Sequence, residues 1–224
     1  MNLKRLLHIL LFLGLFLNIS VAQSGAELSL GIDEFLSKPR PEYQGKKLGL
    51  CTNTGGVNHS GQSTIQLFEQ KFGLDLLLTM DHWNGPTPFS DNLASAVVEG
   101  HLFDQINISD KIPVKIAEII KDLDALFVDI QGIGIRSQSY TVTLQHLLLA
   151  GGIAGTSIII LDRPNPLGGE MVSGNLPQKS LAHPTSFIPI PYRHGMTIGE
   201  LARLLNTENG HGVDLMIIPM DNWQ

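Results

Sequence analysis

The sequence predicts an α/β protein built on an open, mostly parallel sheet with helices on both faces. Several short runs, such as residues 48–52 and 157–161, are continuously apolar, which is typical of strands buried on both faces. These runs alternate with segments of helical periodicity, which indicates β-α-β crossovers between parallel strands. With 224 residues, of which 43% are hydrophobic and 16% charged, the chain is long and apolar enough to bury the core that such a domain needs.

The first 22 residues have the composition of a secretory signal peptide. Lys4 and Arg5 precede an almost wholly apolar run over residues 6–17, and small residues surround the predicted cleavage point after Ala22. The apolar run is shorter than the roughly 20 residues that span a bilayer. We therefore expect a protein exported to the periplasm or the medium, with no stable membrane span after cleavage. An uncleaved anchor is the alternative.

The rest of the chain divides into a lead-in over residues 23–46 and one domain over residues 47–224. In the lead-in, residues 31–36 predict a short helix, and Pro39 and Pro41 end regular structure after it. Strands are predicted at residues 48–52, 74–80, 125–130, 157–161 and 213–218. Helices are predicted at residues 63–72, 93–99, 113–122, 139–150 and 197–206.

Local signals support the helix boundaries. Residues 63–66 and 197–200 have the capping-box pattern, in which a hydroxyl residue precedes Glu or Gln by three positions. Pro113 suits the first turn of its helix. Gly151 and Gly152 are predicted to end the helix that precedes them.

Charge and motif content exclude several functions. The net charge is −6 and no basic stripe with interleaved aromatics is present, so we expect no nucleic-acid partner. Cys51 is the only cysteine, which leaves neither an internal disulfide nor a cysteine metal site and predicts a buried thiol. The glycine-rich run at residues 55–61 lacks the spacing of a nucleotide-binding fingerprint, and no Gly-x-Ser-x-Gly or His-x-x-x-His motif occurs. We therefore expect no cofactor, and the sequence leaves the oligomeric state open.

Polar residues follow four consecutive predicted strands. They are Asn53 after the first strand, Asp81 and His82 after the second, Asp129, Gln131 and Arg136 after the third, and Asp162, Arg163 and Asn165 after the fourth. The carboxyl ends of parallel strands meet at one edge of a sheet, and ligands of open α/β sheets bind in the crevice beyond that edge. The sequence therefore predicts one binding site that all of these side chains share.

Structural explanations stand beside the functional ones. Asn53 is equally well explained as a turn residue, and Asp162 with Arg163 is equally well explained as an ion pair that holds its loop. Function is favoured for Asp81 because His82 follows it directly. His194, taken alone, is also compatible with a packed loop histidine. A divalent-metal site made of Asp and His residues is a weaker hypothesis; its ligands would be Asp81, His82, Asp129 and His194.

Two longer stretches resemble the NamZ-type exo-β-N-acetylmuramidases, a family long known only as a domain of unknown function. They are residues 162–169 (DRPNPLGG) and residues 189–202 (PIPYRHGMTIGELA). Residues 31–33, 52–64 and 127–131 resemble further blocks of the family in the same order. The resemblance extends over about residues 31–220 and implies a Rossmann-like domain. In the family a smaller C-terminal domain follows, which this sequence is expected to lack.

The resemblance also implies a function and a set of site residues. Family members remove terminal N-acetylmuramic acid from peptidoglycan fragments, so the expected ligand is a small muropeptide or amino sugar. Asp81 would be the catalytic acid, His82 would orient it, and Asp129 would be a second carboxylate. Arg136 or Arg193 would hold the lactyl carboxylate of muramic acid. The expected substrate-binding residues are Asn53, Gln131, Arg136, Tyr140, Asp162, Arg163, Asn165, Arg193 and His194.

Several positions depart from the family pattern. Asp81-His82-Trp83 stands where the family has Glu-His-Gly, which shortens the reach of the acid by one methylene. Gly132 and Gln138 replace an Asp and a Tyr of the family. These changes motivate an alternative in which the protein is a catalytically inactive muramyl-sugar-binding relative or a truncated fragment.

Overall fold

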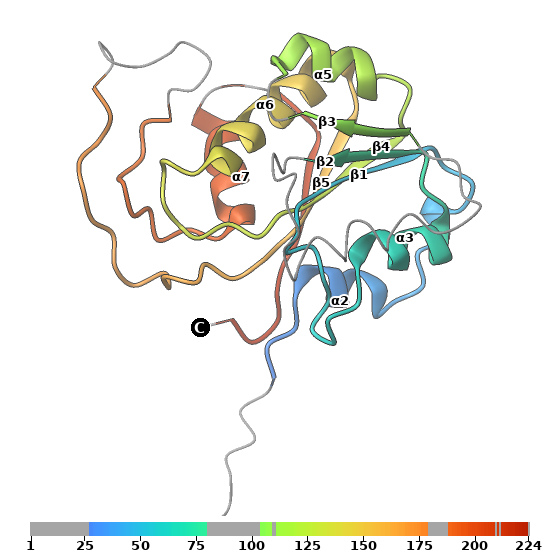
Figure 1. Cartoon of the computed structure of the whole chain (residues 1–224), viewed down its shortest axis with the longest axis horizontal. Coiled ribbons are helices and arrows are strands. Elements are labelled where there is room, and N and C mark those ends of the chain that lie inside the picture. Colours follow the sequence, from blue (N-terminus) through green and yellow to red (C-terminus); the bar gives the residue numbers. More distant parts are fainter. Residues whose placement is uncertain are drawn as a thin grey trace, which may run out of the picture.

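A computed structural model describes residues 27–79, 104–108, 111–178, 188–208, 210 and 212–223. Its centre is a six-stranded sheet in the order β3-β2-β1-β4-β5-β6, in which every neighbouring pair is parallel (Figure 1). The strands are β1 (Leu48–Thr52), β2 (Leu76–Thr79), β3 (Asp104–Asn107), β4 (Ala125–Asp129), β5 (Ser157–Leu161) and β6 (Leu215–Ile218). This is the strand order of the Rossmann-type doubly wound sheet, and it confirms the predicted fold class.

Helices cover both faces of this sheet. Figure 1 shows α5, α6 and α7 on one side and α2 and α3 on the other. The helices are α2 (Gly31–Leu36), α3 (Thr64–Phe72), α5 (Pro113–Ile120), α6 (Ser139–Ala154) and α7 (Ile198–Glu208), and a 3₁₀ turn, η1, covers Pro41–Tyr43. The helix predicted at residues 93–99 lies outside the described residues.

Two sequence predictions about these elements were wrong. Strand β3 was missed because Asp104–Asn107 is a polar tetrapeptide at the sheet edge and lacks the apolar run that marks an interior strand. Helix α6 does not end at Gly151. A side chain on Gly151 would press against Ile158 and Val213, so this glycine serves close helix-sheet packing. The helix ends instead at Gly155, which adopts the left-handed conformation (φ 73°).

The two capping-box predictions had different outcomes. At α7, Thr197 Oγ1 accepts from Glu200 N–H (3.2 Å), and Thr197 N–H donates to Glu200 Oε2 (2.9 Å). This box is formed as predicted. At α3, Ser63 is the N-cap residue but its side chain makes no capping hydrogen bond.

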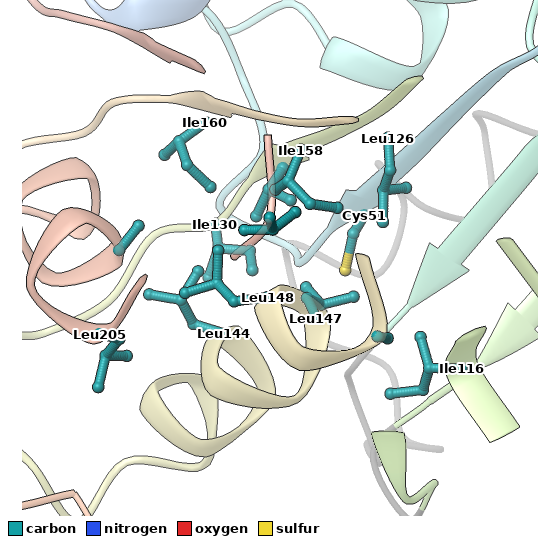
Figure 2. Packing of buried hydrophobic residues seen from close by; sticks show 14 of the residues in the cluster. Cys51, Ile116, Leu126, Ile130, Leu144, Leu147, Leu148, Ile158, Ile160 and Leu205 are labelled. Atoms are coloured by element: carbon teal, nitrogen blue, oxygen red, sulfur yellow. The ribbon is translucent and has the colours of Figure 1, made fainter. Parts of the chain in front are cut away.

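Alternate residues of β1, β2, β4 and β5 pack into two separate cores. On the α5, α6 and α7 side, Cys51 and Val128 join a large aliphatic cluster, in which Leu144, Leu147 and Leu148 of α6 face the strands (Figure 2). The prediction of a buried Cys51 is confirmed. On the opposite side, the strands contribute alternating residues to an aromatic cluster. The aromatic side chains in and around this cluster are Phe35, Tyr43, Phe68, Phe72 and Phe127.

The lead-in is part of the domain. Gly31 N–H donates to Asp162 O (2.9 Å), and a side chain on Gly31 would collide with the backbone of residues 161 and 162. Ser29 pairs with Asp221 through two backbone hydrogen bonds of 3.0 Å. The lead-in therefore packs against the edge of the sheet where the strands end. Within the described residues, no helix is long and apolar enough to cross a membrane.

Candidate functional site

The carboxyl ends of β1 and β4 lie side by side at the centre of the sheet. Thr52 pairs with Asp129 at this end. Strand order reverses here, with β2 and β3 on one side and β5 and β6 on the other, which makes it the topological switch point where open α/β sheets bind ligands. Asn53, Asp129 and Arg163 lie together on this rim. Asp81 and His82, which follow β2 in the sequence, lie outside the described residues.

Asp129 and Arg163 form a buried ion pair within this rim. Asp129 is 0% exposed and Arg163 3%. Arg163 Nη2 donates to Asp129 Oδ2 (2.8 Å), its Nε donates to Oδ1, and Nη2 also reaches Val57 O (2.6 Å). Thr64 Oγ1 donates to Asp129 Oδ2 (2.5 Å). In this conformation Asp129 is shielded from solvent, so its carboxylate holds the loops together and does not reach a ligand directly.

The surroundings of Arg163 favour its charged form. Burial alone opposes the charge on the Arg163 guanidinium. The adjacent Asp129 carboxylate outweighs this effect through its charge and hydrogen bonds, so the pKa of Arg163 is raised. A buried pair of this kind is strongly destabilising to break, because the remaining partner is left as an uncompensated charge.

Asp162 is tied to the N-terminus of α7. Its Oδ1 accepts from Gly199 N–H (2.8 Å) and Arg163 N–H (2.9 Å), and its Oδ2 accepts from Thr197 Oγ1 (2.9 Å). A side chain on Gly199 would come within 2.8 Å of the Asp162 carboxyl carbon. Burial raises the pKa of Asp162, and these hydrogen bonds oppose the rise. Asp162 therefore anchors the start of α7. The sequence suggested an ion pair between Asp162 and Arg163, but Arg163 pairs with Asp129 instead.

Asn53 joins the loops after β1 and β4. Its Nδ2 donates to Gln131 O (2.9 Å), and its Oδ1 accepts from Gln131 N–H and from Gly55 N–H, both at 3.2 Å. A side chain on Gly55 would lie 2.6 Å from Gln131 Cβ. The Asn53 amide therefore extends the β1–β4 pairing by one residue beyond the strands.

Gln131 and Asn165 connect this region to the loop after β5. Gln131 Nε2 donates to Pro164 O (3.1 Å) and to the carbonyl of residue 132 (2.7 Å). Asn165 Nδ2 donates to Met196 O (3.1 Å). Gly134 has a φ of 82°, and a side chain there would lie 2.1 Å from Asn165 Oδ1. Glycine is therefore required at position 134 for the close approach of Asn165.

The two arginines predicted to hold a carboxylate bind backbone carbonyls. Arg136 Nη1 donates to Asn175 O and Ile190 O, both at 2.6 Å. Arg193 Nη2 donates to Leu167 O, and its buried Nε has no partner among the described residues. Both guanidinium groups thereby connect loops that are far apart in the sequence.

A small pocket lies between the loops after β4 and β5 and the start of α7. Its volume is about 20 Å³, which is room for about one water molecule. The polar side chains that line it are Gln138, Tyr140, Thr141, Arg163, Asn165 and His194. No Asp or Glu is among the lining residues described. Gln138 also binds Ile133 N–H through Oε1 (2.8 Å).

His194 is the titratable side chain of this pocket. It is 7% exposed, and its Nδ1 accepts a hydrogen bond from Met196 N–H (3.2 Å). This bond places the proton of the neutral ring on Nε2. Burial lowers the pKa of His194, so the ring is neutral at pH 7.

Sequence reasoning missed some residues that organise the site. Thr197 was recognised as the start of a helix, and Thr64 only as part of the helix predicted at residues 63–72. Their hydrogen bonds to Asp162 and Asp129 join residues 35 and 65 positions apart. The metal-dependent alternative finds no support in the described ranges, where no group of three or more His, Cys, Asp or Glu side chains gathers. Two of its four proposed ligands, Asp81 and His82, are outside those ranges.

A larger hollow lies elsewhere in the described part of the chain. It has a volume of about 590 Å³ and is lined by residues at the C-terminal ends of α2 and α3, including Lys38, Arg40 and Lys71. Cations at helix C-termini compensate the helix dipole. This open depression therefore has a structural explanation for its charge, and we assign no ligand to it.

The sequence and the fold were compared with known proteins. The family model described as exo-β-N-acetylmuramidase NamZ, N-terminal, matches residues 48–224. The peptidoglycan β-N-acetylmuramidase NamZ of Bacillus subtilis (strain 168) is 32% identical over 201 residues, which make up 88% of this chain and 49% of the relative. The chain thus spans about half the length of this curated relative.

Two solved structures from Bacteroides fragilis NCTC 9343 are similar in fold. One DUF1343 family protein has a TM-score of 0.75 and 30% identity, with 88% of this chain and 51% of that chain covered. A second DUF1343 family protein has a TM-score of 0.71 and 24% identity, with 89% and 53% covered. Both agree with the Rossmann-like sheet described above.

Proposed function

Because the chain belongs to the family of the N-terminal domain of the exo-β-N-acetylmuramidase NamZ, we propose that it is a glycoside hydrolase-like protein that acts on N-acetylmuramic acid-containing peptidoglycan fragments. The observation that carries this proposal is the family match over residues 48–224, together with 32% identity to a peptidoglycan β-N-acetylmuramidase. The ligand would lie at the switch point between β1 and β4.

In this proposal the catalytic acid is Asp81. Glycoside hydrolysis requires a carboxylic acid that protonates the leaving oxygen. Asp129 is buried within the rim, and no carboxylate is among the described residues that line the pocket. The acid must therefore come from another segment of the rim, and Asp81 directly follows the β2 region in sequence. His82 would orient Asp81 or the sugar.

The polar groups near the pocket would contact the sugar. Tyr140, His194 and Gln138 line the pocket, whose volume admits one small group of a ligand and not a whole sugar ring. The neutral His194 ring offers an N–H donor at Nε2. Asn53, Asp129, Asp162, Arg163, Arg136 and Arg193 would act indirectly, because their hydrogen bonds fix the loops that carry the contacting groups.

The alternative function is binding without hydrolysis. The replacement of the family's Glu by Asp81 and the small size of the pocket favour it, since a carboxyl displaced by about 1 Å can lose about 100-fold in rate. In this case the chain would still bind muramyl sugars at the same rim.

The two functions differ in turnover. The test measures release of nitrophenol from 4-nitrophenyl β-N-acetylmuramide, with calorimetric titration of N-acetylmuramic acid on the same protein. We expect release by the wild type, loss of release in Asp81→Asn, and binding retained in that variant. Binding without release in the wild type would select the inactive relative. Absence of both would refute the proposal.

We also propose that the protein is exported, on the basis of the layout of residues 1–22. The test is N-terminal sequencing of the protein recovered from a bacterial host. A mature chain that begins at Gln23 in the periplasmic or medium fraction is expected, whereas an intact N-terminus in the cytoplasmic fraction would refute export.

A further inference from the structure

A hydrogen-bonded chain of Asp33, His59 and Ser60 lies outside the pocket described above. Asp33 belongs to α2, and His59 and Ser60 belong to the turn between β1 and α3. Asp33 Oδ1 lies 2.8 Å from His59 Nδ1, and His59 Nε2 lies 3.0 Å from Ser60 Oγ. None of the three residues lines the pocket. A hydroxyl, an imidazole and a carboxylate joined in this order form the arrangement that activates a serine nucleophile.

The hydrogen bonds assign a role to each ring nitrogen of His59. An ionised carboxylate only accepts hydrogen bonds, so Nδ1 of the neutral ring carries the proton that is donated to Asp33. Nε2 is then the acceptor, and the Ser60 hydroxyl is its donor. His59 can therefore receive the hydroxyl proton when Ser60 attacks a substrate, while Asp33 keeps the ring in the required tautomer.

Asn58 holds the turn that carries these two side chains. Its Oδ1 accepts from Ser60 N–H (3.0 Å) and from Gln62 N–H (2.8 Å). Its backbone N–H donates to Gln62 O, and its carbonyl accepts from Gly61 N–H, both at 2.9 Å. These bonds close the turn without the His59 ring or the Ser60 hydroxyl. Both groups are therefore available for chemistry in a turn of fixed shape.

Asp33 is fixed by contacts of its own. Its Oδ2 accepts from Leu30 N–H (3.3 Å) and from His59 N–H (3.2 Å), while its Oδ1 binds the imidazole. The Asp33 side chain is 13% exposed, whereas that of His59 is 51% exposed and Ser60 is also exposed. The carboxylate is thus a shielded acceptor, and a substrate can reach the other two groups.

The charges around His59 restrict the substrate. The hydrogen bond to Asp33 and the charge of Asp33 raise the pKa of His59, and the Glu27 carboxylate adds to this rise. Two carboxylates beside the ring disfavour an anionic acyl donor. Exposed side chains on a turn also offer little apolar surface to a long acyl chain. The site therefore suits an uncharged ester with a short acyl group.

We propose that Ser60 and His59 form a second catalytic site, which hydrolyses uncharged esters of short-chain carboxylic acids, with Asp33 as a positioning residue. Ser60 Oγ bonds to the acyl carbon as His59 Nε2 takes the hydroxyl proton. The ester C–O bond then breaks, and this proton passes to the departing alcohol. Water next attacks the acyl-serine, giving one proton to His59, which returns it to Ser60 Oγ as the carboxylic acid leaves. The exposed Gln62 amide, whose Oε1 accepts from Asn58 Nδ2 (2.9 Å), offers its NH₂ group to the carbonyl oxygen.

The first test measures phosphonylation of serines in the full chain by an uncharged alkyl phosphonofluoridate, with peptide mass spectrometry as the readout. In this reaction the Ser60 Oγ–P bond forms, the P–F bond breaks, fluoride leaves, and His59 takes the proton. Ser37 is the matched control, because it is also exposed and its hydroxyl only donates to Glu34 O (2.8 Å). We expect Ser60 to react about tenfold or more faster than Ser37. Equal rates would overturn the proposal.

His59→Gln removes the base and keeps a polar side chain. The rate at Ser60 should then fall to the rate at Ser37, in a protein whose urea midpoint shows that it is folded. An unchanged rate at Ser60 would overturn the role of His59.

The pH profile tests the positioning role of Asp33 in a way that a structural contact would not reproduce. The neutral ring is the base, so labelling of Ser60 should increase as pH rises through the pKa of His59. Asp33→Asn removes the charge that raises this pKa, so the increase should move to lower pH. Glu34→Gln, on the same helix, is the control and should leave the profile in place. A profile that Asp33→Asn does not move would contradict the positioning role.

A last measurement separates turnover from simple acylation. Incubation with 4-nitrophenyl acetate should produce acetyl-Ser60, which should disappear from the wild type once the reagent is removed and persist in His59→Gln. Equal persistence in both proteins would show that the acyl group is not hydrolysed and would overturn the proposed activity. Because none of the three residues lines the pocket, this proposal and the muramidase proposal succeed or fail separately.

Discussion

Two sets of polar residues differ in burial and in what they contact. One set lies directly at the strand ends, and the other lies further along the loops. At the strand ends, Asn53, Asp129 and Asp162 are buried, and hydrogen bonds from neighbouring loops and helices occupy their oxygens. Further along, Gln138 and Tyr140 are only partly buried and line the pocket. The difference indicates that the first group holds the rim together, whereas the second group lines the space that a ligand would enter.

This division follows from the geometry of a parallel sheet. A residue at the last position of an interior strand has neighbouring strands on both sides and helices above and below, so its polar group must find a partner inside the protein. A residue several positions later has left the sheet and can face solvent.

The largest effect is expected at the buried ion pair. Arg163→Met should lower the free energy of unfolding by about 3–5 kcal/mol, because Asp129 is left charged and unpaired in the interior. Lys115→Met is the control, since the 3.0 Å pair of Lys115 with Glu118 is exposed and its loss should cost about 0–1 kcal/mol. Urea unfolding measures both. Similar small losses in the two variants would show that the pair does not hold the rim.

A smaller effect is expected at a glycine between the two regions. Gly134→Ala adds a methyl group against Asn165 and should cost about 1–3 kcal/mol more than Gly155→Ala. Gly155 has a similar positive φ (73° against 82°) but nothing lies within 4 Å of an added side chain. The difference between the two losses of unfolding free energy therefore excludes the strain of the positive φ and reports the contact with Asn165 alone. Equal losses in urea unfolding would mean that Asn165 moves aside freely.

A pH effect is expected from the pocket histidine. Burial lowers the pKa of His194 in the folded state, so the unfolded chain binds the proton more readily. The contribution of His194 to stability should therefore decrease as pH falls from about 6.5, the unfolded value, toward the folded pKa. Urea midpoints of the wild type and His194→Gln, measured between pH 7.5 and 5, check this. Parallel curves for the two proteins would contradict it.

The smallest effect is expected on the surface, where His59 binds Asp33. His59 Nδ1 lies 2.8 Å from Asp33 Oδ1, and this hydrogen bond with the Asp33 charge raises the pKa of His59. The stabilisation from this contact is present below the pKa that His59 has in the unfolded chain. It is lost as pH rises through the pKa of His59 in the folded protein. NMR titration of the His59 ring should show a lower pKa in Asp33→Asn and little change in Glu34→Gln. An unaltered pKa in both would argue against the contact.

The sequence predicted much of the fold because the interior strands depend on local patterns. Strands β1 and β5 are continuous apolar runs, and their predicted bounds match the structure. Edge strand β3 and the full length of α6 required knowledge of what packs beside them. Gly151, for example, signals a helix end in sequence but serves packing against Ile158.

The site was predictable in position and less so in the roles of its residues. The rule for parallel strands placed Asn53, Asp129 and Arg163 on one rim. The sequence cannot show that Arg136 and Arg193 donate to carbonyls, because every residue has a carbonyl and only the path of the chain selects Asn175 and Leu167. The placement of Asp81 and His82 remains a prediction.

The pairing of Ser29 with Asp221 has a consequence for engineering. Two backbone hydrogen bonds of 3.0 Å hold these residues side by side, although 192 positions separate them in the sequence. A short linker would join them without distorting the sheet, and circular permutation is tolerated where ends are close and the new opening lies in an exposed turn. Gly61, in the turn before α3, has open space around it and offers such an opening. A permuted chain that starts there would carry the lead-in and β6 as one continuous internal segment.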